Sequence, residues 1–83
     1  MNEIDFTEAA KKIIKKYSNE KNKQQISLKE IYVVWNCKTL QNNKALLSTP
    51  VPDGRYYEVT YDGDKKRFYF DAYIKEHNES ISI

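Results

Sequence analysis

Near the start of the chain, apolar residues recur at the spacing of one helix face. The recurring residues are Phe6, Ala9, Ala10, Ile13, Ile14 and Tyr17, and this spacing places them on a single apolar stripe. Asp5 and Glu8 have the spacing of a capping box, which predicts that the helix starts at Asp5. The apolar stripe stops at Tyr17 and only polar residues follow from Ser18 to Gln25, so we expect the helix to end near Ser18 or Asn19. The pattern therefore predicts an amphipathic helix over about residues 5–18, with its lysines on a solvated face.

The next segment changes from polar to apolar. Residues 18–25 carry no large apolar side chain, so we expect a mobile connection over about residues 18–26. Ser27 and Glu30 have capping-box spacing, which predicts one helical turn. Residues 31–35 are then β-branched and aromatic without a break, which is typical of a strand with both faces at least partly covered. The alternative is a helix over residues 27–40.

Two groups of turn-forming residues divide the region that follows. Asn42 and Asn43 tolerate positive φ, so residues 41–44 are expected to form a two-residue hairpin turn. That turn would place Leu40 opposite Ala45 and Lys38 opposite Leu47. The next break is Pro50, Pro52, Asp53 and Gly54, because proline removes strand hydrogen-bond donors and Asp-Gly favours a turn.

Strict alternation marks the last two predicted strands, over residues 56–61 and 67–74. One face combines Tyr57, Val59 and Tyr61 with Phe68, Phe70, Ala72 and Ile74. The opposite face carries Tyr56, Glu58, Thr60, Arg67, Tyr69, Asp71 and Tyr73. Residues 62–65 predict a hairpin with a loop of two or four residues, which sets the two apolar faces side by side and assigns them to the core.

These elements predict a single α+β domain over residues 1–83. Its N-terminal amphipathic helix packs on a four-stranded antiparallel sheet, made of two hairpins over about residues 31–75. The tail over residues 76–83 is expected to fray or to add an edge pairing. A domain this small buries only about 60–65% of its unfolded surface, and one helix-covered face cannot hide all of its aromatic residues. We therefore expect a homo-oligomer, either a dimer or larger.

Charge and cysteine content narrow the classes of partner. Lys and Arg number 14 against 12 Asp and Glu, a net charge of +2, which makes duplex nucleic acid an improbable partner. We expect no membrane association, because no apolar run has the length of a membrane span and no signal peptide begins the chain. One cysteine and one histidine argue against an internal disulfide and structural zinc. The expected location is the cytoplasm.

Residues suited to catalysis are few. His77 lies in a polar tail, and Cys37 has no histidine partner within its own strand. Asp62 and Asp64 belong to the predicted second hairpin, where turn geometry accounts for them. No glycine-rich phosphate loop is present, since the chain has only 2 glycines. We therefore expect a protein that is not an enzyme and holds no cofactor or metal.

Residues suited to binding are more abundant. Tyrosine rings beside an arginine can stack a base and hold a phosphate, while amides and lysine can extend the polar contacts. The alternative interpretation is that the rings pack half-buried on the sheet or cover a dimer interface. The expected ligand-binding residues are Trp35, Asn36, Lys38, Gln41, Asn43, Tyr56, Arg67, Tyr69 and Tyr73.

Residues 33–75 resemble an uncharacterised family of small proteins carried by phages and prophages of Gram-positive bacteria. The matching pieces are Val34-Trp35, Lys38-Thr39-Leu40-Gln41-Asn42, Lys44-Ala45-Leu46, Asp53-Gly54, Glu58-Val59-Thr60-Tyr61, Gly63-Asp64-Lys65 and Asp71-Ala72-Tyr73. Residues 76–83 depart from the apolar, cysteine-containing ending that family members often have. The resemblance implies a phage origin and an accessory role, with no established activity.

Two functions fit this inventory. The first is a non-enzymatic phage protein that binds and sequesters a small nucleotide signal of host defence, because such a ligand needs stacking rings, a few cations and amide donors. The second is an inhibitor that binds a host defence or replication protein through a tyrosine-rich surface, since Tyr, Trp and Arg are the usual interface anchors. Either would act in the cytoplasm of the host cell.

Overall fold

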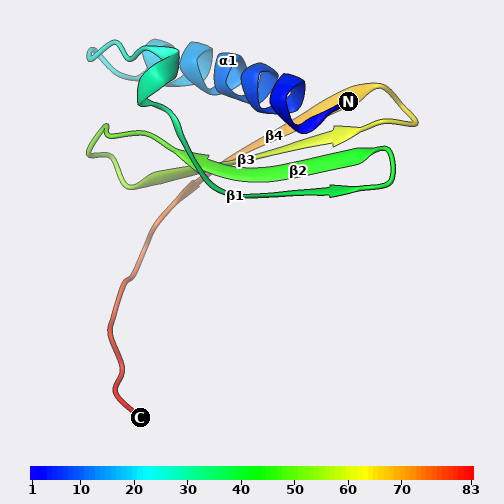
Figure 1. The fold of residues 1–83 in the computed structure, drawn as a ribbon. Helices are drawn as coiled ribbons and strands as arrows, with labels where there is room; N and C mark the ends of the chain where they lie inside the picture. Colours follow the sequence, from blue (N-terminus) through cyan, green and yellow to red (C-terminus); the bar gives the residue numbers. More distant parts are fainter.

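A computed structural model describes residues 1–83 as one helix layer on one sheet layer (Figure 1). The elements are α1 (Glu3–Lys21), the 3-10 turn η1 (Leu28–Glu30), β1 (Tyr32–Thr39), β2 (Asn42–Ser48), β3 (Arg55–Asp62) and β4 (Arg67–Ile74). The strands follow the order β1-β2-β3-β4 and every neighbouring pair is antiparallel. The predicted α+β class, with an N-terminal helix on a four-stranded antiparallel sheet, is confirmed.

The helix begins earlier than the sequence pattern indicates. Asn2 is the N-cap, and its side-chain Oδ1 accepts a hydrogen bond from the backbone N–H of Asp5 at 2.8 Å. The predicted start, with a capping box of Asp5 and Glu8, was therefore wrong. Asn2 satisfies one of the free N–H groups of the first turn, and Asp5 instead lies inside that turn, where its charge still complements the helix dipole.

The helix also ends later than predicted, inside the segment expected to be a mobile connection. Asn22 donates to the Ser18 carbonyl through its backbone N–H at 2.9 Å and its side-chain amide at 3.1 Å. The Asn19 side chain then accepts from the Ile26 N–H at 2.9 Å and donates to the Ile26 carbonyl at 3.3 Å. Asparagine hydrogen bonds and the burial of Ile26 therefore hold residues 18–26 against the fold.

The first helical turn after this connection is confirmed, and the strand follows it. The Ser27 N–H donates to the Glu30 carboxylate at 2.9 Å in a capping box. The alternative of a helix over residues 27–40 is wrong, because β1 pairs along its length with β2. A register shift between Val33 and Trp35 marks a β-bulge, which sends these two side chains to opposite faces of the sheet.

The first hairpin turns at Leu40 and Gln41, so the predicted turn at Asn42 and Asn43 was wrong. Thr39 pairs directly with Asn42, and Leu40 has a φ of 56°. Both asparagines belong to β2 instead. The Asn42 side chain accepts a hydrogen bond at 3.0 Å from the backbone N–H of Gly63, which lies in the second hairpin loop. Asn43 is buried.

The register of this hairpin changes with the turn. Lys38 lies opposite Asn43, and Asn36 lies opposite Ala45. The predicted pairs, Leu40 with Ala45 and Lys38 with Leu47, were wrong. We attribute the position of the turn to a contact outside the hairpin. The backbone N–H of Gly63, in the loop between β3 and β4, donates to the side chain of Asn42, and this bond favours Asn42 in the strand.

The alternation of faces in the second hairpin is confirmed, but the assignment of Ile74 to the core was wrong, because Ile74 is 66% exposed at the end of β4. A four-residue loop joins β3 to β4, since Asp62 pairs with Arg67. The face turned toward α1, which we call the covered face, carries Val33, Asn36, Lys38, Asn43, Ala45, Leu47, Tyr57, Val59, Tyr61, Phe68, Phe70 and Ala72. Asn36, Lys38 and Ala72 of this face are exposed and lie outside the core.

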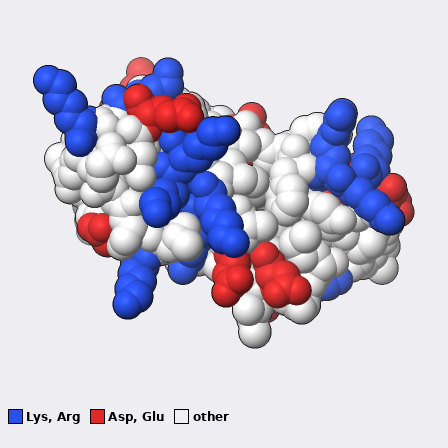
Figure 2. All heavy atoms as spheres, turned by 90° about the horizontal axis from the view of Figure 1, so that it is seen from above, with Lys and Arg blue, Asp and Glu red and all other residues white.

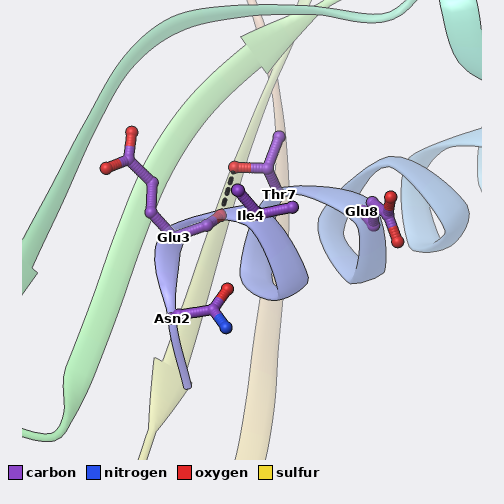
Figure 3. Close-up of a pocket in the computed structure, with 5 residues that line it drawn as sticks. All are labelled: Asn2, Glu3, Ile4, Thr7 and Glu8. Carbon is purple, nitrogen blue, oxygen red and sulfur yellow. Dashed lines mark hydrogen bonds between the residues drawn. The ribbon is translucent and has the colours of Figure 1, made fainter.

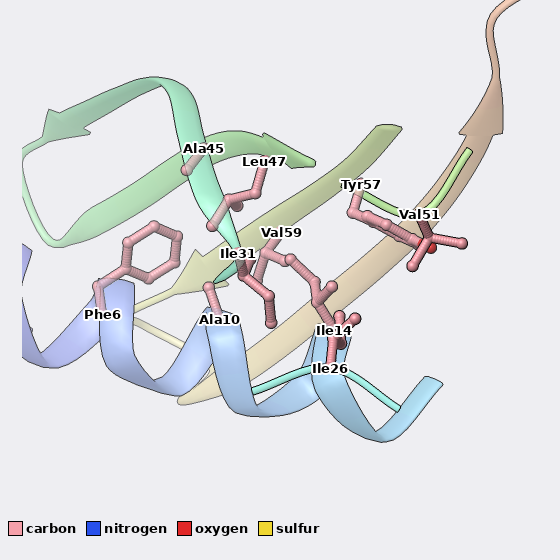
Figure 4. Packing of buried hydrophobic residues seen from close by; sticks show 10 residues of the cluster. All are labelled: Phe6, Ala10, Ile14, Ile26, Ile31, Ala45, Leu47, Val51, Tyr57 and Val59. Carbon is pink, nitrogen blue, oxygen red and sulfur yellow. The ribbon is translucent and has the colours of Figure 1, made fainter. Parts of the chain in front are cut away.

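The hydrophobic core lies between α1 and the covered face. Figure 4 shows the helix side chains pointing toward those of the strands. Tyr17 adds edge-to-face contacts to Tyr57 and Phe70, with ring centroids 5.9 and 5.3 Å apart, a geometry that aromatic pairs favour. The buried apolar residues are Phe6, Ala10, Ile14, Ile26, Ile31, Ala45, Leu47, Val51, Tyr57 and Val59.

We expect Tyr57→Phe to raise the free energy of unfolding by up to about 1 kcal/mol at pH 7, because the buried Tyr57 hydroxyl has no hydrogen-bond partner. Burial also raises the pKa of Tyr57 above its ordinary value of 10.0. The unfolded chain would therefore lose this proton first above about pH 10, so the folded state would be less stable there. Urea unfolding of both proteins at pH 7 and above pH 10 measures the difference. A loss of stability at pH 7 would contradict an unsatisfied hydroxyl.

Candidate functional site

The sheet face turned away from α1 is covered by no other element (Figure 1). We call it the open face. It is the place where side chains of the sheet are available for binding, because the opposite face is occupied by the core. Its residues are Tyr32, Trp35, Cys37, Thr39, Asn42, Lys44, Leu46, Ser48, Tyr56, Glu58, Thr60, Asp62, Arg67, Tyr69, Asp71 and Tyr73.

A hollow of about 500 Å³ lies on the open face over β1, β2 and β3. Lys44 lines it, and the Lys44 ammonium lies 3.4 Å from the Glu58 carboxylate. An indole, hydroxyls, an amide and a cation therefore converge on one small area, a combination that suits a polar ring system carrying a negative charge. The lining residues are Trp35, Cys37, Thr39, Asn42, Lys44 and Thr60 of the open face, together with Asn43, which is buried and belongs to the covered face.

Other half-exposed aromatic rings share the open face with this hollow. Tyr69 follows Thr60 in the same cross-strand row, and Tyr32 and Tyr73 lie at the far end of the open face. Together with Trp35, these rings are between 42% and 50% exposed. Half-exposed rings offer flat surfaces for stacking at about 1–3 kcal/mol per base. Tyr56 is less available, because the Lys75 ammonium lies 5.7 Å from its ring centroid.

The structure places the expected ligand-binding residues on two faces and a turn. Trp35, Tyr56, Arg67, Tyr69 and Tyr73 share the open face, whereas Asn36, Lys38 and Asn43 point to the covered side by strand alternation. Gln41 lies in the first hairpin turn, where its amide donates to the Asp64 carboxylate at 2.6 Å. One site therefore cannot use all of these residues together, and of the first group only Trp35 lines the hollow.

Sequence reasoning missed Lys44 and Thr60 as candidate ligand contacts. Thr60 could have been found, because alternation already put it on the same face as Tyr56 and Tyr69. Lys44 was hidden by the wrong turn, which treated it as the end of a loop. With Thr39 opposite Asn42, Lys44 lies beside Thr60 in the middle of the open face.

The most voluminous hollow, about 590 Å³, lies at the first turn of α1 (Figure 3). One helix turn makes its entire lining, and the Thr7 hydroxyl donates to the Glu3 carbonyl at 2.7 Å. Glu3 and Glu8 contribute two carboxylates to it, so it would repel an anionic ligand. The lining residues are Asn2, Glu3, Ile4, Thr7 and Glu8.

Lysines gather over the helix side of the molecule (Figure 2). A hollow of about 310 Å³ between α1 and η1 is lined by Glu8, Lys11, Lys12, Leu28 and Lys29. It offers positive charge without an aromatic ring or an amide. It could attract an anion, but it lacks the groups that would distinguish a nucleotide from other anions.

Titratable and nucleophilic groups are scattered over the fold. His77 contacts Glu79 at 2.7 Å, and both side chains are exposed in the tail. The Cys37 thiol is exposed on the open face, 3.6 Å from the Thr39 hydroxyl. No three His, Cys, Asp or Glu side chains come together as metal ligands would. No helix has both the length and the apolar character needed to cross a membrane.

Comparison with known proteins identifies a family. The family described as "Family of unknown function (DUF6275)" matches residues 7–83, which include the helix, the whole sheet and the tail. No curated protein and no solved structure matches the chain. The open face must therefore be interpreted from its own chemistry.

Proposed function

We propose that this chain, which belongs to the DUF6275 family, is a non-enzymatic binding protein that sequesters a small nucleotide-type ligand on its open face. We further propose that it is a phage-encoded accessory protein of a Gram-positive host, and that the ligand is a signal of host defence in the host cytoplasm. The observation that supports the ligand class is the hollow on the open face, which combines an exposed indole with a lysine.

The contacts on this face match the parts of a nucleotide. Trp35 and Tyr69 offer rings on which a base could stack. Lys44 and, further along the face, Arg67 offer cations for phosphate, and the arginine fork can hold two phosphate oxygens at once. Hydroxyls and an amide line the space between them, and such groups can bind a ribose or the edge of a base.

A host protein is the second candidate ligand. The same half-exposed tyrosine and tryptophan rings are residue types that carry most of the energy in protein interfaces. On this alternative, the chain would cover a functional surface of a host defence or replication protein. The hollow would then receive a side chain of the partner instead of a nucleotide.

The test that separates the two candidates is release of a bound molecule. The protein is incubated with a nucleotide extract of host cells, washed and denatured, and the supernatant is analysed by mass spectrometry. Recovery of one nucleotide in stoichiometric amount supports sequestration. Calorimetry with mono-, di- and cyclic nucleotides that gives no heat, combined with capture of a host protein, would favour the inhibitor.

We expect Lys44→Ala to weaken nucleotide binding about tenfold, which corresponds to about 1.4 kcal/mol, because a charge-assisted contact in a partly enclosed hollow would be lost. Arg67→Ala should weaken binding in the same direction. Lys16→Ala is the matched control, since this lysine is exposed on α1, and an exposed lysine there contributes little. Calorimetry measures all three, with circular dichroism to verify folding.

Tyr69→Phe separates stacking from hydrogen bonding at the same site. The variant keeps the ring and removes only the hydroxyl. Unchanged affinity would indicate stacking, and a clear loss would indicate a hydrogen bond from the hydroxyl. Equal affinity of Lys44→Ala, Arg67→Ala and the unmodified chain would place the ligand elsewhere on the molecule.

A further inference from the structure

We infer that the open face is an interface with a second copy of this chain, and that the tail, residues 75–83, of each copy lies against the other. The inference concerns assembly and holds with or without a ligand. One extension rests on the proposed function: a nucleotide in the hollow would have the second copy as its other wall.

The single chain exposes more surface than a compact protein of its mass. Its accessible surface is 6058 Å², whereas a folded monomer of 9.9 kDa is expected to expose about 5,200 Å². Its radius of gyration is 13.8 Å, against about 12 Å for a compact domain of this length. Residues 75–83 form no regular element and are all exposed, so the extended tail contributes to this excess and is itself surface that a partner could cover.

The exposed apolar groups lie where this interface would form. Four large half-exposed residues share the open face, and two fully exposed isoleucines, Ile81 and Ile83, belong to the tail. The four residues on the open face lie on the two edge strands, β1 and β4, and Ser48, Lys44, Glu58 and Thr60 of the central strands lie between them. Exposed rings on one face are a common mark of an interaction surface. The residues on the open face are Tyr32, Trp35, Tyr69 and Tyr73.

The tail leaves its own domain on the open-face side (Figure 1). The backbone hydrogen bond from Lys75 N–H to the Gly54 carbonyl, at 2.7 Å, ties its first residue to the sheet, and residues 76–83 form no regular element. Residues 80–83 alternate serine and isoleucine, so an extended chain directs both isoleucines to one side. Eight extended residues reach about 26 Å, which is the length of a strand of this sheet.

The charges on the open face favour a second copy of the same chain as the partner that covers this face. The open face carries Lys44 and Arg67 together with Glu58, Asp62 and Asp71, so both signs are present and two such faces can meet without strong repulsion. The helix side is less suited, because residues 1–31 hold seven lysines against five acidic residues. A two-fold contact requires a self-complementary surface, and only the open face combines mixed charge with exposed rings.

A second copy would also complete the ligand site. Binding sites for small molecules bury about 70–90% of the ligand surface, whereas a single sheet face contacts a stacked base from one side only. In a face-to-face pair, the rings of the second copy would cover the other side of the base. The hollow would then be a chamber between two sheets.

Two measurements on the full chain without nucleotide, from 1 to 100 µM, test the interface. Sedimentation gives the mass of the particle, and the fluorescence emission of Trp35, the only tryptophan of the chain, reports whether the open face is covered. We expect a particle of twice 9.9 kDa and a blue shift of the emission as the concentration rises. Tyr73→Glu should raise the dimer dissociation constant at least tenfold. Lys16→Glu, an exposed change on α1, should leave the dissociation constant unchanged.

A second variant guards against misfolding of the first. The double change Ile81→Ser with Ile83→Ser lies outside the core, so it cannot unfold the domain through lost packing, and it should also weaken the dimer. A 9.9 kDa particle at 100 µM, or a dimer that both variants leave intact, would overturn the inference. Nucleotide binding by a monomer would overturn the interface alone, whereas a dimer that binds no nucleotide would overturn the proposed function alone.

Discussion

Replacing Phe6 by alanine should remove a large part of the stability of this domain. Phe6 is 1% exposed and its ring stacks on that of Phe68, with centroids 6.4 Å apart. Truncation of a buried phenylalanine costs about 3–5 kcal/mol, and a domain of this length has about 4–12 kcal/mol in total. Because the Phe6 ring holds the first turns of α1 against the end of the sheet, its removal should destabilise the helix and the sheet together.

The control for this variant lies two residues away. Ile4 is on the same helix and 73% exposed, so Ile4→Ala should change the free energy of unfolding by no more than about 0.5 kcal/mol. Urea unfolding followed by circular dichroism compares the two variants. Similar small losses for both would mean that α1 is not held to the sheet by its first turns.

The elements that sequence could predict are those whose signal is local and repeated. The helix stripe from Phe6 to Tyr17 and the alternation in β3 and β4 extend over several periods, so an error at one position does not change the assigned face. Ser27 and Glu30 also interact within one turn. The boundaries of α1 were missed because its caps, Asn2 at the start and Asn22 at the end, are asparagines, a residue type that is equally common in loops.

The first hairpin could not be predicted because distant contacts decide it. Asn42 and Asn43 resemble turn residues in isolation, but Asn42 bonds to the loop between β3 and β4. The bulge beside Val33 is likewise invisible to an alternation rule, which would put Val33 and Trp35 on one face. Both features change the candidate site. The turn at Leu40 and Gln41 places Lys44 inside β2, and the bulge directs the Trp35 indole to the open face.

Gly63→Ala should cost about 3 kcal/mol of folding stability, because the two hairpin turns of the sheet touch at this glycine. A Cβ atom there would lie 2.1 Å from the backbone oxygen of Gln41, far inside van der Waals contact. Overpacking alone costs about 1–3 kcal/mol. Separating the turns would also break the Gln41–Asp64 and Asn42–Gly63 hydrogen bonds, which are worth about 1 kcal/mol each.

Gly54→Ala is the matched control, since it makes the same change in the loop between β2 and β3. Gly54 has a φ of 71°, and an added Cβ would meet nothing nearer than a backbone oxygen at 4.0 Å. Its cost is therefore only that of a left-handed residue, about 1–2 kcal/mol. If urea unfolding shows Gly63→Ala to be the milder change, the two turns do not pack together in solution. The position of the first hairpin, and with it the place of Lys44 on the open face, would then need another cause.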